Sequence, residues 1–237
     1  GTQNHILIAA QYGGTTMKET LQIAIDGPAG AGKSSVAKAL AKRLGCIYLD
    51  TGAMYRAVTW FAMQEQVSLE DSAAMEALLE KIQLEFKEEP GGQHLYCNGV
   101  DITEAIRTTE ISANVSAVAM LPSVREAMVA QQQKIAADCD VLMDGRDIGT
   151  TVLPDARYKF FLTASLEERA RRRCLELQQK GIAVDLEQMK RDIALRDEKD
   201  SKRAVSPLVQ AADAERIDTS DMTLEEVVEK LFAKIAK

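Results

Sequence analysis

The sequence predicts an α/β fold in which helices flank a mostly parallel core sheet. Short apolar runs of strand length alternate with longer segments whose apolar residues recur every three or four positions. A glycine-rich segment, residues 27–34, lies between the first predicted strand and the first predicted helix. The chain has 237 residues, 46% of them hydrophobic and 27% charged. This composition is typical of a globular protein with one large domain or two small ones.

The alternation begins with a strand over residues 21–26 and an amphipathic helix over 33–44. A second strand over 46–49 and a helix over 53–64 follow. Strands that alternate with helices in this way form parallel sheets, because the connecting helix returns the chain to the same edge.

The alternation lapses between residues 81 and 122. Two apolar segments, 82–86 and 93–97, flank the turn sequence Pro90-Gly91-Gly92 and predict a hairpin, after which two short helical patterns follow. We therefore expect an inserted subdomain at about 80–120. The α/β pattern then resumes with a helix over 123–137, strands over 141–143 and 158–162, helices over 166–179 and 185–200, a strand over 216–218 and a helix over 223–235.

The glycine-rich segment matches the P-loop pattern G-x-x-x-x-G-K-[ST], and it has the strand and helix on either side that this motif needs. Its residues are Gly27, Pro28, Ala29, Gly30, Ala31, Gly32, Lys33 and Ser34. Backbone N–H groups and the positive end of the helix dipole would bind the polyphosphate of ATP. Lys33 would reach the β and γ phosphates, and the Ser34 hydroxyl would bind Mg²⁺. Ser35 is either a further phosphate contact or an ordinary helix residue.

The charge balance limits the partners. The chain has 29 Lys and Arg residues against 36 Asp and Glu residues, a net charge of −7, which argues against nucleic acid polymers and anionic membranes. Four dispersed cysteines without a C-x-x-C pair, and only two histidines, do not predict a zinc site. Cysteines used in this way are typical of a reduced cytoplasmic protein.

Five segments resemble the bacterial cytidylate kinase family. They are IAIDGPAGAGKSS (23–35), YLDTGAMYRA (48–57), PSVREAM (122–128), DGRDIGT (144–150) and RDEKDSKRAVSPL (196–208). The resemblance covers nearly all of the chain after Met17. It implies a monomeric P-loop kinase that uses ATP and Mg²⁺ to phosphorylate CMP or dCMP, giving CDP or dCDP.

The resemblance also implies roles for single residues. Lys33, Arg56 and Arg146 would be catalytic, with the two arginines holding the acceptor phosphate. Asp147 would accept a hydrogen bond from the cytosine amine, and Ser116 and Arg125 would donate to the ring. Because uracil has a carbonyl where cytosine has the amine, Asp147 would reject UMP.

The remaining substrate contacts come from the start of one helix and the end of another. Arg196 and Asp200 would lie near the sugar and Arg203 near the phosphate, although Arg196 and Asp200 are also spaced as an ordinary helix ion pair. Thr51 is either a substrate ligand or a helix N-cap. Arg146 could alternatively pair with Asp144.

We expect residues 1–16 to be an added leader before a native start at Met17, and residues 17–237 to form a single kinase domain. The core would be 17–79, 121–165 and 186–237, and a mobile arginine-rich lid would cover about 166–185, with no single arginine assigned. Two alternative functions stay open: a kinase that also accepts UMP, and a P-loop switch that binds ATP without catalysis.

Overall fold

The computed structural model describes residues 19–203 and 207–236, which fall into two compact units. We call residues 21–49 and 140–237 the sheet unit, and residues 50–139 with 1–20 the helical unit. The expected leader, the Ala204–Ser206 part of the last motif and Lys237 lie outside the described residues. The helical unit is larger than the subdomain expected at about 80–120.

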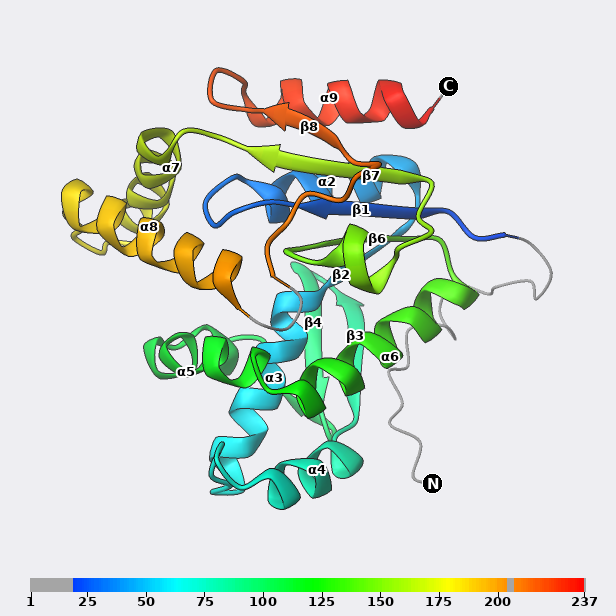
Figure 1. Cartoon of the computed structure of the whole chain (residues 1–237), viewed down its shortest axis with the longest axis vertical. Coiled ribbons are helices and arrows are strands. Elements are labelled where there is room, and N and C mark those ends of the chain that lie inside the picture. The colour runs from blue at the N-terminus through cyan, green and yellow to red at the C-terminus, as the bar shows by residue number, and fades with distance from the viewer. Residues whose placement is uncertain (1–18, 204–206, 237) are drawn as a thin grey trace. The chain divides into compact units, whose positions relative to one another are not determined.

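The sheet unit is built on five strands in the order β2-β6-β1-β7-β8 (Figure 1). Their bounds are β1 Gln22–Asp26, β2 Ile47–Asp50, β6 Val141–Gly145, β7 Tyr158–Thr163 and β8 Glu215–Asp218. β1 pairs in parallel with β6 and β7, and β7 pairs in parallel with β8. The predicted α/β class is confirmed, and each strand was expected at this place to within two residues.

Helices α2 (Lys33–Leu44) and α9 (Leu224–Ile235) pack on this sheet. Leu40 of α2 and Leu231 of α9 join Ile23, Ile25 and Leu162 of the strands in one buried cluster. α2 begins after a left-handed glycine and ends at another, so both of its boundaries are set by the sequence.

Two further helices, α7 (Leu166–Gln179) and α8 (Leu186–Lys202), follow β7 and pack against each other (Figure 1). Helix α7 and the loop after it make up the segment expected to be the lid, about 166–185. A π-helical turn, η2 (Ile148–Val152), follows β6 and was not expected. Such turns are rare and occur frequently at functional sites.

The helical unit contains four α-helices, one 3₁₀ turn and a small sheet within its described residues. They are α3 Thr51–Gln64, α4 Ser72–Lys81, β3 Leu84–Glu89, β4 Gly92–Cys97, β5 Val100–Asp101, η1 Ala105–Arg107, α5 Thr109–Ala119 and α6 Pro122–Asp138. The expected hairpin is β3 and β4, and β5 extends it to three antiparallel strands. Helix α4 was missed, although Asp71 caps it by accepting a hydrogen bond from the N–H of Ala74 at 3.1 Å.

The two faces of the small sheet differ. Leu84, Phe86 and Leu95 are buried on one face. On the other, Nδ1 of His94 lies 2.8 Å from an Asp101 oxygen and 3.4 Å from a Glu89 oxygen. The hydrogen bond to Asp101, assisted by the charge of Glu89, raises the pKa of His94 above 6.5.

All four cysteines are thiols, and Cys97, Cys139 and Cys174 are buried, as expected of cysteine used as a small hydrophobic residue. Within residues 19–203 and 207–236, none of the helices combines the length and the apolar composition that a membrane span requires.

Candidate functional site

The P-loop follows β1 in the sheet unit and needs glycine for steric reasons. At Gly27, φ is 153°, and a Cβ atom there would lie 2.0 Å from the carbonyl oxygen of Leu162. Gly30 and Gly32 adopt left-handed conformations with φ of 77° and 82°. The loop then passes directly into α2, whose first N–H groups have no partner within the helix and can bind an anion.

Lys33 lies against this loop and is 6% exposed. Its Nζ donates to the carbonyl oxygen of Pro28 at 2.9 Å. Burial and, next, the positive charge of Arg146 hold the pKa of Lys33 well below its usual value, and Asp144 opposes them. A bound polyphosphate would supply the negative charge that stabilises the protonated lysine.

Asp144, near the carboxyl end of β6, joins the P-loop helix to β2. Its Oδ2 accepts from the Ser34 hydroxyl at 3.1 Å, and its Oδ1 accepts from the Tyr48 hydroxyl at 2.8 Å. A hydroxyl and a carboxylate oxygen are hard donors of the kind that Mg²⁺ binds beside substrate phosphates. Ser34 and Asp144 therefore fit a magnesium ion.

Arg146 pairs with α8. Its Nε lies 3.2 Å from Oδ2 of Asp200, so the pairing partner shown is Asp200 and not Asp144, which was the alternative expectation. The charge of Arg196 also acts on Lys33 and lowers its pKa. Arg203 is the C-cap residue of α8. The sheet unit thus gathers Lys33, Arg146, Arg196 and Asp200 at the carboxyl ends of the parallel strands, where such sheets bind ligands.

Asp147 occupies the N-cap position of η2 and is 5% exposed. Its side chain makes no capping hydrogen bond to the turn. That role falls to Asp26, the last residue of β1, which accepts from the N–H groups of Ile148 at 2.8 Å and Gly149 at 2.7 Å. Burial raises the pKa of Asp26 to about 6, and the nearby charge of Asp147 adds to the rise. Asp26 was not predicted from the sequence as a site residue.

A cavity of about 330 Å³ adjoins the P-loop. It is lined mainly by apolar groups and opens between the start of α2, helix α7 and the loop after β8. Its lining includes Gly30, Gly32, Ser35, Val36, Arg172, Arg173, Gln179, Thr219, Met222 and Leu224. This cavity was not predicted from the sequence, because the residues of its walls are far apart in the chain and only the P-loop part carries a motif.

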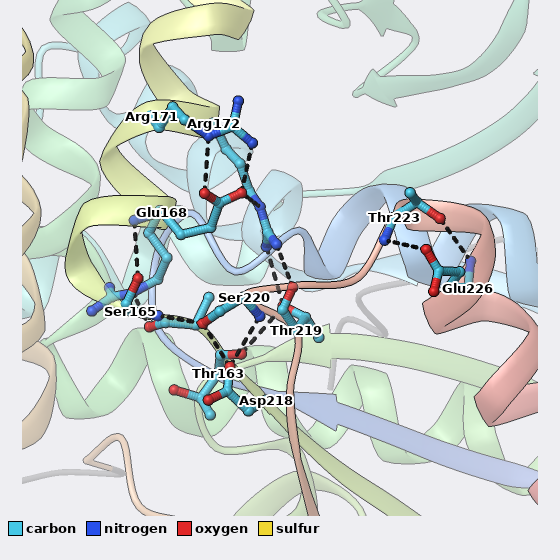
Figure 2. A network of polar contacts seen from close by, with 12 residues as sticks. Thr163, Ser165, Glu168, Arg171, Arg172, Asp218, Thr219, Ser220, Thr223 and Glu226 are labelled. Carbon is cyan, nitrogen blue, oxygen red and sulfur yellow. Dashed lines mark hydrogen bonds and ion pairs between the residues drawn. The ribbon is translucent and has the colours of Figure 1, made fainter.

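A polar network fixes one wall of this cavity (Figure 2). Arg172 of α7 donates to Oγ1 of Thr219 at 3.1 Å and also to its carbonyl oxygen. The same guanidinium pairs with Glu168 at 3.1 Å, and Glu168 also binds Arg171. The backbone N–H of Ser165 donates a hydrogen bond to the hydroxyl oxygen of Ser220 at 2.9 Å. The loop after β8 is therefore tied to the first turn of α7.

Arg169 has a different position from the other arginines of α7. It is buried, and it donates to the carbonyl oxygen of Ala29 in the P-loop at 3.1 Å. It also pairs with Asp197 of α8 at 2.7 Å. Hence Arg169 braces the P-loop, whereas Arg172 lines the cavity, a distinction that the arginine-rich sequence alone did not make.

In the helical unit, the two predicted arginines contact backbone carbonyls. Arg56 of α3 donates to the carbonyl of Ile106 at 3.1 Å and to the Ser112 hydroxyl at 2.8 Å. Arg125 of α6 is 3% exposed and donates to the carbonyl of Ala119 at 3.2 Å. Its guanidinium also lies 5.3 Å from the centre of the Tyr55 ring.

The other two predicted residues of this unit differ in burial. Ser116 is exposed on α5, and Thr51 is buried in the first turn of α3. The N-cap of α3 is Asp50, which accepts from the N–H of Ala53 at 3.0 Å. The N-cap interpretation of Thr51 is therefore wrong. Arg107, which lies 3.3 Å from Asp50, was not expected near this helix start.

Comparison with known proteins agrees with this geometry. A family model described as "Cytidylate kinase" matches residues 23–237. The chain belongs to the cytidylate kinase family. A cytidylate kinase from Shouchella clausii is 55% identical over 216 residues, covering 91% of this chain and 96% of that relative. A cytidylate kinase from Lactobacillus gasseri is 54% identical, covering 92% and 94%, and one from Streptococcus pneumoniae is 52% identical, covering 92% and 99%.

A solved structure of a protein from Eubacterium ventriosum is similar in fold, with a TM-score of 0.50 and 13% identity over 92% of this chain and 99% of that chain. The predicted site of this cytidylate kinase family member is divided between its units. The sheet unit contains the P-loop, Arg146, Asp147, Arg196, Asp200 and Arg203, and the helical unit contains Thr51, Arg56, Ser116 and Arg125. The substrate roles of these residues stay predictions.

Proposed function

We propose that the protein transfers the γ-phosphoryl group of ATP to CMP or dCMP, producing ADP and CDP or dCDP. The observation that carries the proposal is the polyphosphate site of the sheet unit. There a P-loop with its buried Lys33 lies within the field of Arg146 and Arg196. Membership of the cytidylate kinase family supports the choice of acceptor.

ATP would bind with its phosphates in the P-loop and its adenosine in the 330 Å³ cavity beside it. The apolar lining suits a purine ring, and Arg172 and Thr219 bound the cavity with polar groups. Ser34 and Asp144 would hold Mg²⁺, which supplies neutralisation of the β and γ phosphate charges when bound. Lys33 would move from the Pro28 carbonyl to the transferring phosphoryl group.

The acceptor would be bound by its phosphate, its base and its sugar. Arg56, Arg146 and Arg203 would bind its phosphate, because guanidinium groups match two phosphate oxygens. Asp147, with Ser116 and Arg125, would read the cytosine ring, and Arg196 and Asp200 would meet the sugar. Thr51 would contact the substrate at the start of α3. In-line transfer then needs positioning and charge neutralisation without a covalent enzyme intermediate.

ADP release with CMP, dCMP, UMP, AMP and GMP as acceptors tests the proposal. We expect turnover with CMP and dCMP and little with the other three. Equal rates with UMP and CMP would instead support a broader pyrimidine kinase, and ATP binding without turnover on any acceptor would support a switch.

Asp147→Ala tests the base-reading residue. It should reduce the preference for CMP over UMP by about 1–3 kcal/mol, the contribution of a buried hydrogen bond that is no longer made. Glu126→Ala on α6, an acidic residue outside the predicted site, is the control and should leave the preference unchanged.

We further propose that the enzyme works as a monomer in the cytoplasm on small nucleotides. Light scattering of the purified protein, with and without nucleotides, checks the oligomeric state. A mass of two chains or more in the active fraction would contradict it.

A further inference from the structure

The geometry points to Asp26, the last residue of β1, as a positioning residue. Its side chain caps the π-helical turn η2, which follows β6, and in this way it holds Asp147 in the orientation that reads the cytosine ring. The inference rests on the proposed function, since it assigns a role relative to base recognition. Asp26 itself would touch no substrate.

Asp26 binds the turn with both of its carboxylate oxygens. Oδ1 accepts from the N–H of Ile148 and Oδ2 from the N–H of Gly149, at 2.8 and 2.7 Å. These are the first two residues of η2, where a helical turn leaves its N–H groups without internal partners. A carboxylate that accepts two hydrogen bonds from adjacent residues fixes both the position and the rotation of the turn.

Asp147 is the residue that would normally do this. It stands at the N-cap of η2, and an aspartate there usually accepts from the N–H two or three residues further along. Its φ of −133° and ψ of 22° differ from the extended backbone of the other aspartate caps, Asp50, Asp71 and Asp185, and its carboxylate makes no capping bond to η2. Because Asp26 caps the turn, η2 does not depend on the carboxylate of Asp147 for its cap.

The surroundings of Asp26 leave it little freedom. It is 5% exposed, and Ile148 and Gly149 are buried. A Cβ atom on Gly149 would lie 3.3 Å from Oδ2 of Asp26 and 3.2 Å from Cδ of Lys159, so the turn is in close contact with both side chains. The charged groups that act on Asp26 are Asp147, which disfavours its ionised form, and Lys33, which favours it. A buried carboxylate near another one is costly unless it is hydrogen-bonded, which the two N–H groups provide.

Asp26→Asn tests the proposal, because the amide keeps the shape and places an NH₂ group against one of the two N–H donors. The ratio of kcat/KM for CMP to kcat/KM for UMP should fall by about tenfold or more, and the amide protons of Ile148 and Gly149 should exchange faster with solvent. Asp71→Ala is the matched control, since it removes a carboxylate cap from α4 and should lower stability without changing the ratio.

A second variant, Gly149→Ala, alters the contact between Asp26 and η2 by changing the turn. Gly149→Ala should force the turn away from Asp26 and lower the ratio while Asp26 is intact. The double variant Asp26→Asn with Asp147→Ala should be no less selective than Asp147→Ala alone, because both substitutions remove the same interaction, the recognition of the cytosine ring by Asp147.

Three outcomes distinguish the positioning role of Asp26 from the proposed function. A selective wild-type enzyme whose ratio is unchanged in Asp26→Asn and in Gly149→Ala overturns the positioning role while leaving the proposed function intact. A wild-type enzyme without preference for CMP overturns base reading by Asp147 and the role of Asp26 with it. Should Asp26→Asn fail to fold, Gly149→Ala decides alone, and an unchanged ratio in that variant contradicts the proposal.

Discussion

The polyphosphate site of the sheet unit and the acceptor residues of the helical unit are constructed differently. The first comes from one continuous segment, residues 27–34, whose backbone conformation is set by glycines in the left-handed region. The second comes from side chains on three separate helices, α3, α5 and α6. A backbone site depends on the local fold, whereas a site of side chains depends on how several helices pack.

The basic residues of the two sites also differ in their contacts. Lys33 is buried and acts within a group of charged residues. Arg56 and Arg125 instead donate to backbone carbonyls of neighbouring segments. We infer that Lys33 of the sheet unit contributes mainly charge stabilisation to phosphoryl transfer, and that Arg56 and Arg125 of the helical unit contribute mainly affinity for the acceptor.

The largest expected effect is that of Lys33→Ala. We expect kcat to fall by about 10³-fold, the size found when a preorganised charge-stabilising group is removed. Stability should not fall at pH 7, because the lowered pKa of Lys33 means that the fold disfavours its charged form. Steady-state kinetics and thermal unfolding measure the two effects. Lys42→Ala, an exposed residue of the same helix, is the control, and a kcat near that of the wild type would contradict the comparison.

The next effect concerns backbone geometry. Gly27→Ala should lower the free energy of unfolding by about 3 kcal/mol, because the new Cβ meets the Leu162 carbonyl oxygen and φ is unfavourable for an L-residue. Gly45→Ala has a left-handed φ of 69° and nothing within 4 Å of its Cβ, so it should cost only about 1 kcal/mol. Urea unfolding measures both values. Equal losses would show that strain alone, without the close approach, makes glycine necessary in the P-loop.

Arg56→Ala should have a smaller effect and a different kinetic signature. We expect KM for CMP to rise about 10- to 100-fold, as for lost hydrogen bonds to a charged group, with KM for ATP nearly unchanged. Arg107→Ala removes an exposed ion pair with Asp50 in the same unit and should change neither constant appreciably. Equal increases in both KM values for Arg56→Ala would contradict the division between donor and acceptor sides.

The sequence was sufficient for the sheet unit because its signals are local. Apolar strand runs, the glycines that bound α2 and the P-loop pattern all lie within short windows, and the structure places these elements where they were expected. The roles of Arg169 and Arg172 could not be separated in this way. Both belong to one run of arginines, and their partners, Ala29 and Thr219, lie about 140 and 47 residues away in the sequence.

Asp26 shows the same limit more clearly. It ends a strand that was predicted correctly, but its partner is a turn 122 residues further along the chain. The π-helical turn has no periodic signal of its own at five residues. Likewise, β5 has only two residues and depends on pairing with β4, so that nothing in its own sequence predicts it.

The smallest expected effect is on the pH dependence of stability, and it distinguishes two causes of a raised pKa. In the helical unit, the partners of His94 favour its protonated form, whereas in the sheet unit burial disfavours the charge of Asp26 and raises its pKa to about 6. The folded-state pKa of His94 is above its unfolded value of 6.5, so its contribution to stability is fully present below pH 6.5 and is lost as the pH rises through the folded pKa.

An NMR titration of the His94 ring, assigned with His94→Gln, should therefore give a midpoint above 6.5, and Asp101→Asn should return it toward that value. Glu85 lies on the same face of the small sheet as His94, because it pairs with Tyr96, which is two residues from His94. The control variant Glu85→Gln should therefore change the midpoint less than Asp101→Asn does.

Between pH 6.5 and 8, the wild-type protein should lose slightly more stability than His94→Gln. The folded-state pKa of Asp26 is raised from 3.8 to about 6, so the stability that its protonated form contributes is present below pH 3.8 and is lost as the pH rises to about 6. The two units therefore lose stability in different pH windows. An unshifted His94 midpoint would mean that solvent screens the charges of Asp101 and Glu89. Burial of Asp26 would then be the one of these two causes that still raises a pKa.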